Sequence, residues 1–115
     1  MILDQWMQNL GYDVKRLMKS HYAFEKSENV ALIQIIDIIK PEERLLNDSD
    51  YVEGMKEDRA KRVLKGIFEN VALPAIEVFK NNDGTYTLKD GYHRYTISKF
   101  LAFTHIPVSE ASPSE

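Results

Sequence analysis

The sequence contains no cysteine, which excludes disulfides, zinc sites built on thiolates and cysteine nucleophiles. It also lacks any apolar run near the ~20 residues that a membrane-spanning helix needs. Its first residues, Met1 to Trp6, carry no basic cluster, and Asp4 interrupts their apolar stretch, so we expect no signal peptide. These absences predict a soluble protein of the cytoplasm, with no membrane partner.

An excess of positive charge is missing as well. Fifteen Lys and Arg residues stand against eighteen Asp and Glu residues, so the formal net charge is −3. A domain that holds DNA mainly through its phosphates needs a basic surface, so this balance does not favour that class of protein. The length of 115 residues and the hydrophobic fraction of 43% are those of one compact domain with a core.

Apolar residues recur at helical spacing in several parts of the sequence. Near the N-terminus they predict a short amphipathic helix that ends at Gly11, followed by a second short helix around Leu17. The same spacing predicts a longer amphipathic helix over 51–69 and a last helix over 92–103.

Strands are predicted where β-branched residues lie between turn residues. The run 30–39 (VALIQIIDII) is the strongest strand signal. Segments 75–80 and 85–89 form a predicted hairpin, because the Asp-Gly pair between them favours the positive φ of tight turns. A short final strand is expected over 106–108. The order of helices, strand, helix, hairpin, helix and strand predicts an α+β domain around a small mixed sheet.

One segment, Asp90-Gly91-Tyr92-His93-Arg94 (hereafter the box), lies where the predicted hairpin ends and the last helix begins. Free backbone N–H groups and the positive end of the helix dipole meet at such a junction, which suits it to an anion. Gly91 would let the backbone approach a phosphate closely, and His93 and Arg94 would add side-chain donors. In the alternative interpretation Asp90 is only an N-cap, Gly91 only a tight turn, and the two basic side chains are solvated.

The box, the helix after it and the segment Thr104-His105-Ile106-Pro107-Val108 resemble the ParB/sulfiredoxin superfamily. Members of that superfamily carry a Gly-x-His-Arg or Gly-x-Arg-Arg box after a hairpin, then a helix and a closing strand similar to Ile106-Pro107-Val108. Upstream, the matching words are Ile35-Ile36-Asp37, Lys40-Pro41-Glu42-Glu43 and Leu73-Pro74-Ala75-Ile76-Glu77-Val78. The resemblance covers 30–108 and implies a ParB/sulfiredoxin-like domain there, with 1–29 as a helical N-terminal extension and 109–115 as a flexible tail.

The function that this resemblance implies differs between branches of the superfamily. In sulfiredoxins a catalytic cysteine precedes the His-Arg pair, but here Tyr92 stands in that position, so sulfinic-acid reduction by that mechanism is excluded. In chromosome-partitioning ParB proteins the box binds CTP phosphates and a helix-turn-helix domain follows. The few residues after Val108 leave no room for that module, so we do not expect this chain alone to bind DNA.

The free serine kinases are the branch whose short sequence motifs are most similar to those of this chain. They carry a Lys-Pro-His-Glu element after the first strand and an Asp-Gly-His-His-Arg box that grips the nucleotide. By that match Glu43 is the candidate catalytic carboxylate and the candidate ligand of Mg²⁺. In the alternative interpretation Glu42 and Glu43 are charges favoured in a first helical turn after Pro41.

The sequence therefore supports two hypotheses of function. The first is a nucleotide-binding domain that takes ATP or CTP with Mg²⁺, as a phosphotransferase or nucleotidase, with Asp90, Gly91, Tyr92, His93 and Arg94 at the phosphates. The second is a non-catalytic ParB-like module that binds DNA or a protein partner.

Two further features bear on the second hypothesis. Lys61, Arg62 and Lys65 on the 51–69 helix are the candidate contacts with nucleic acid, although neighbouring acidic residues dilute this basic face. The apolar face of the first helix, which includes Trp6, either packs on the domain's own sheet or forms a homodimer or another protein contact.

Overall fold

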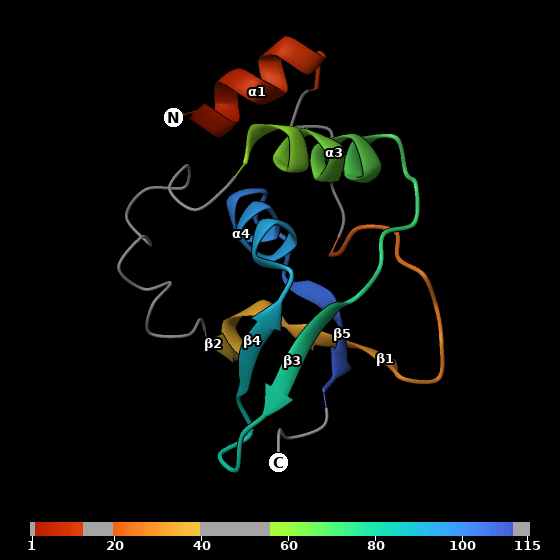
Figure 1. Ribbon diagram of the computed structural model, residues 1–115, viewed down its shortest axis with the longest axis vertical. Helices are drawn as coiled ribbons and strands as arrows, with labels where there is room; N and C mark the ends of the chain where they lie inside the picture. Colours follow the sequence, from red (N-terminus) through yellow and green to blue (C-terminus); the bar gives the residue numbers. More distant parts are fainter. Residues whose placement is uncertain (1, 13–19, 40–55, 112–115) are drawn as a thin grey trace.

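The computed structural model describes residues 2–12, 20–39 and 56–111, and the fold is given for these residues. In chain order the elements are α1 (Ile2–Leu10), β1 (Val30–Gln34), the 3₁₀ helix η2 (Ile35–Asp37), β2 (Ile38–Ile39), α3 (Glu57–Phe68), β3 (Ile76–Lys80), β4 (Tyr86–Asp90), α4 (Tyr92–Phe100) and β5 (His105–Glu110). Figure 1 shows the sheet, α4, α3 and α1 stacked in that order, which confirms the α+β class. The helix expected around Leu17 and the first residues of the 51–69 helix lie outside the described residues.

The five strands form one mixed sheet in the order β1-β5-β3-β4-β2. The pairs β1–β5 and β3–β4 are antiparallel, whereas β3–β5 and β2–β4 are parallel. β1 and β2 therefore lie at opposite edges, although only the three residues of η2 separate them in sequence. A flat sheet of five strands would put its edges about 19 Å apart, whereas three residues of 3₁₀ helix rise only about 6 Å. The sheet must therefore curl so that the end of β1 comes near the start of β2.

This curl explains why the run 30–39 is not the single strand that its composition predicts. β1 and β2 pair with different neighbours, so the chain has to bend between them. The bend falls at η2, next to Gln34 and including Asp37, the two polar residues that interrupt the apolar run. Ile35 and Ile38 point into the core on either side of the bend, while Ile36 is 85% exposed.

The helices α3 and α4 each end in a left-handed residue that turns the chain back. After α3, Asn70 has φ 58° and the N–H of Val71 donates to the carbonyl of Gly66 at 2.9 Å. After α4, Ala102 has φ 62° and the N–H of Phe103 donates to the carbonyl of Ser98 at 3.1 Å. This is the Schellman arrangement, and it ends α4 at Phe100, three residues before the end that the sequence predicts.

The last strand is longer than expected. β5 continues to Glu110, because Ser109 pairs with Val30 on one side and with Glu77 on the other. The first two residues of the segment expected to be a flexible tail are thus part of the sheet, and residues 112–115 lie outside the described residues.

The N-terminal segment packs against the rest of the domain. Trp6 and Met7 are 5% and 4% exposed and belong to the core cluster. α1 contacts α3, so the expected self-packing is confirmed, although it occurs on a helix rather than on the sheet. Tyr22 is also in the core, and Phe24 forms a parallel bridge with Leu73. The face of α1 that carries Trp6 is thus buried within the chain.

Within the described part of the chain, no helix has the length and the apolar character that crossing a bilayer requires.

Candidate functional site

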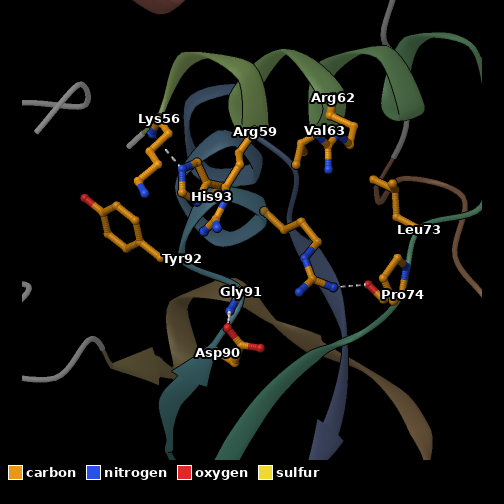
Figure 2. Close-up of a pocket in the computed structure, with 11 residues that line it drawn as sticks. Lys56, Arg59, Arg62, Val63, Leu73, Pro74, Asp90, Gly91, Tyr92 and His93 are labelled. Atoms are coloured by element: carbon orange, nitrogen blue, oxygen red, sulfur yellow. Dashed lines mark hydrogen bonds between the residues drawn. The ribbon is translucent and has the colours of Figure 1, made fainter. Parts of the chain in front are cut away.

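The box lies at the junction of β4 and α4, as the sequence predicts. Gly91 is the N-cap of α4, with a left-handed φ of 105°, and no side chain caps this helix end. Asp90 is the last residue of β4 and its Oδ1 accepts the N–H of Gly91 at 2.9 Å (Figure 2). Asp90 is therefore not the N-cap of the alternative interpretation, and the Gly91 amide that was expected to face a phosphate is engaged.

Gly91 is required by packing as well as by its backbone angle. A Cβ at this position would lie 2.5 Å from Cγ2 of Ile76, whose side chain is fully buried in β3. The glycine thus lets the start of α4 rest directly on the sheet, which fixes where the box faces.

Arg94 uses part of its guanidinium to hold this junction together. Its Nη1 donates to the carbonyl of Pro74 at 2.6 Å and to that of Ala75 at 3.0 Å. These carbonyls belong to the segment that enters β3, so the bonds join the first turn of α4 to the start of that strand. The sequence predicts that Arg94 also donates to a phosphate, and the structure shows that its Nη1 is engaged with the backbone.

His93 also makes a contact that the sequence does not predict. Its Nε2 accepts the backbone N–H of Lys56 at 2.8 Å, and Lys56 is the N-cap of α3 (Figure 2). A ring nitrogen that accepts carries no proton, so the neutral imidazole has its hydrogen on Nδ1. His93 therefore joins the starts of two helices. In this arrangement Nε2 of His93 is engaged with α3.

A pocket of about 470 Å³ opens between α3, the start of α4 and the segment before β3 (Figure 2). Four of its lining side chains are cationic and one is a carboxylate, on a chain whose net charge is −3. We call it the cationic pocket, and it is lined by Lys56, Arg59, Arg62, Val63, Leu73, Pro74 and the five box residues.

Part of the basic face predicted on the 51–69 helix lines the cationic pocket. Arg59 and Arg62 are three residues apart, which places them on one side, and both line the cationic pocket. Neither Lys61 nor Lys65 lines the pocket, and Nζ of Lys61 forms an ion pair with Glu57 at 2.7 Å. Of the three residues grouped as candidate contacts with nucleic acid, Arg62 is thus a pocket residue and the two lysines are not.

Arg59 and Lys56 are pocket residues that the sequence reasoning did not single out. The spacing of Arg59 and Arg62 shows that they share a side of the helix. The packing of α3 on α4 decides which side of α3 faces the box. The hydrogen bond between Lys56 and His93 is part of that packing.

Tyr92 is buried at the edge of the cationic pocket, 7% exposed. Tyr95, one turn further along α4, donates its hydroxyl to the carbonyl of Ile38 at 3.3 Å, which ties the helix to β2. Tyr95 thus helps to hold the helix that follows the box against the sheet.

Arg94 also lies close enough to Tyr22 for its charge to act on the buried phenol. Burial raises the pKa of the Tyr22 hydroxyl well above its ordinary value, and the positive charge of Arg94 offsets part of that effect. Arg94 thus acts electrostatically on the core as well as lining the pocket.

The predicted site for Mg²⁺ cannot be placed, because Glu43 lies outside the described residues. Within 2–12, 20–39 and 56–111, no group of three or more His, Asp or Glu side chains could hold a metal ion. Asp90 is the carboxylate that lines the cationic pocket. The described lining therefore suits an anion, which the cationic side chains of the pocket would bind directly.

Comparison with known proteins gives matches among solved structures. No family model and no curated protein matches the sequence. The fold is similar to that of sulfiredoxin from Arabidopsis thaliana, with a TM-score of 0.55 and 20% identity over 73% of this chain and 85% of that chain. It is also similar to the C-terminally truncated chromosome-partitioning protein ParB from Caulobacter crescentus complexed with CTP-γ-S, with a TM-score of 0.54 and 16% identity. That match covers 75% of this chain and 46% of the ParB chain, so this chain spans less than half of it.

Identities this low show the fold and nothing finer. The two matching proteins represent two of the branches that the box and its flanking words resemble in sequence. The sequence resemblance and the structural match thus agree, and the protein has the ParB/sulfiredoxin fold.

Proposed function

We propose that this protein binds the phosphate groups of a nucleotide in the cationic pocket. The observation that carries the proposal is the charge of the lining, in which Lys56, Arg59, Arg62 and Arg94 stand against Asp90 alone. The excess of three positive charges suits a di- or triphosphate. Within the described residues no ion pair neutralises Arg59 or Arg62, so their charges are available to an anion.

The start of α4 adds to the same potential. The positive end of a helix dipole stabilises an anion, and the first turn of α4 contains no acidic residue that would supply one. Arg94 lies in that first turn, where a cationic side chain opposes the dipole. A bound phosphate would relieve this conflict.

The size of the pocket and the structural comparison support a nucleotide as the ligand class. A volume of about 470 Å³ is within the range of small-molecule pockets. The ParB structure with the same fold is complexed with CTP-γ-S. ATP and CTP are therefore the first ligands to test.

The finer proposal is that the protein transfers or hydrolyses the bound phosphate. It depends on Glu43, which the resemblance to free serine kinases makes the candidate catalytic carboxylate or Mg²⁺ ligand. Glu43→Gln should then abolish turnover of the nucleotide while its binding in the absence of Mg²⁺ is retained.

Binding is tested by thermal unfolding of the purified protein with ATP, ADP, CTP and GTP, each with and without Mg²⁺. A ligand at about 100 times its Kd stabilises a protein by ~2.7 kcal/mol, which raises the Tm of a domain this size by several degrees. The absence of a shift with every nucleotide would overturn the proposal.

A matched pair of variants locates the binding site. Arg59→Gln with Arg62→Gln removes two charges from the pocket side of α3, and the nucleotide shift should disappear. Lys61→Gln with Lys65→Gln removes the same charge from positions that do not line the pocket and should keep the shift. If the lysine variant instead lost a salt-dependent interaction with duplex DNA, the DNA-binding module would become the better hypothesis.

A further inference from the structure

The edge strand β1 presents backbone groups that no other described strand uses. Its one neighbour among the described strands is β5. The N–H of Ile35 donates to the carbonyl of Thr104, and Leu32 stands opposite Pro107, which has no N–H to give. Because an antiparallel ladder alternates, Ala31 and Ile33 face β5, whereas Leu32 and Gln34 turn their N–H and C=O groups away from it.

The composition of β1 leaves this edge open to pairing. Natural edge strands are usually blocked by charged side chains, proline or bulges. β1 reads VALIQ, with no charge and no proline, and its central residue Leu32 is 38% exposed. Ile36, just beyond the strand, is 85% exposed. The strand is thus suited to receive another strand along its edge.

The hollows at the two ends of β1 are lined by side chains of opposite charge. At its start, Glu28 and Glu110 line a surface hollow together with Val30. At its end, Lys99 lines a second hollow together with Gln34. A second copy of β1 in antiparallel orientation would bring the acidic end of each strand beside the Lys99 end of the other. A parallel copy would instead set the two acidic ends together.

We propose that two copies of this protein pair through β1, antiparallel, with Leu32 opposite the partner's Leu32 on the two-fold axis. The pairing forms hydrogen bonds from each Leu32 N–H to the partner's Leu32 carbonyl and from each Gln34 N–H to the partner's Val30 carbonyl. The N–H of Val30 is already used, because it donates to the carbonyl of Ser27 at 3.2 Å. The dimer thereby buries Leu32 and joins the two sheets into one.

The absence of cysteine in this protein allows a direct test. Residues directly opposite in a hydrogen-bonded antiparallel pair have Cα atoms about 5.5 Å apart, which is within the range that a disulfide bridges. Leu32→Cys should therefore form a disulfide-linked dimer rapidly under mild oxidation. Val71→Cys is the control, because Val71 is 55% exposed and lies outside β1.

A second pair of variants tests the association without cross-linking. The unmodified protein should show a monomer–dimer equilibrium by sedimentation velocity over a range of concentrations. Leu32→Lys would place two like charges directly opposite each other and should shift the protein to monomer, whereas Val71→Lys should leave the equilibrium unchanged. Circular dichroism checks that both variants remain folded.

Two results would overturn the proposal. One is a monomer at every concentration, which would leave the β1 edge to a strand of another protein. The other is cross-linking of Leu32→Cys no faster than that of Val71→Cys. No residue of β1 lines the cationic pocket, so nucleotide binding and dimer formation can fail independently.

Discussion

The imidazole of His93 accepts a hydrogen bond from the backbone N–H of Lys56, 37 residues earlier in the sequence, at 2.8 Å. A helix leaves its first N–H groups without partners inside the helix, and the N-cap of α3 has no side-chain cap. His93 thus supplies, from α4, an acceptor at the start of α3. Both helix starts line the cationic pocket, and this bond joins them there.

Loss of that acceptor should weaken the docking of α3. We expect His93→Ala to lower the free energy of unfolding by ~1 kcal/mol. His93→Gln, whose amide oxygen can still accept, should lose less. Urea unfolding of the three proteins measures the difference, and an alanine variant as stable as the unmodified protein would contradict the role given to the bond.

Gly91 should tolerate no side chain. Alanine there would combine a left-handed backbone with a contact of 2.5 Å to Ile76, so we expect a loss of about 2–4 kcal/mol in unfolding free energy. Gly84 is the matched control, because its φ is 88° but no atom lies within 4 Å of an added Cβ. Gly84→Ala should show only the backbone cost, so equal losses at both glycines would contradict the packing argument.

Arg94 should affect stability and binding together. Arg94→Lys loses the paired bonds to the carbonyls of Pro74 and Ala75, and hydrogen bonds from a charged group contribute about 1.5–3 kcal/mol. We therefore expect a lower Tm even without nucleotide. Loss of binding in an Arg94 variant does not by itself locate the phosphate, which is why Arg59 and Arg62 carry the binding test. An unchanged Tm in Arg94→Lys would contradict this assignment.

Ala102 offers a stabilising substitution. Its φ of 62° costs an L-residue about 1–2 kcal/mol, and glycine removes most of that cost. Ala102→Gly should raise the Tm by several degrees for a domain of this size. Asn70 occupies the equivalent place after α3 with φ 58°, but asparagine tolerates this conformation, so Asn70→Gly should change the Tm little. A lower Tm for Ala102→Gly would show that the alanine methyl group is needed there.

The parts of the fold that could be predicted from the sequence are those set by local chemistry. Short sequence motifs predict three of these features: the Asp-Gly turn of the β3–β4 hairpin, the end of α1 near Gly11 and the strand-to-helix junction at Gly91. The box also indicated the fold, which the structural comparisons confirm.

The parts that could not be predicted depend on tertiary contacts. The run 30–39 bends because β1 and β2 are themselves the two edge strands of the sheet, and each pairs with a different neighbour. Likewise, the turn of the Arg94 guanidinium toward Pro74 depends on where the segment before β3 lies. The inclusion of Arg59 in the pocket depends on the packing of α3 on α4.

The arrangement of the edge strands also has a consequence for the order of folding. Val30 pairs with Ser109, and Ile38 pairs with Tyr86, so both halves of the run 30–39 close long loops. The β3–β4 hairpin, by contrast, joins neighbours such as Lys80 and Tyr86. Pairings of high sequence separation form slowly, because loop-closure entropy opposes them. During synthesis, therefore, the run 30–39 leaves the ribosome before β4 and β5, the strands with which it pairs.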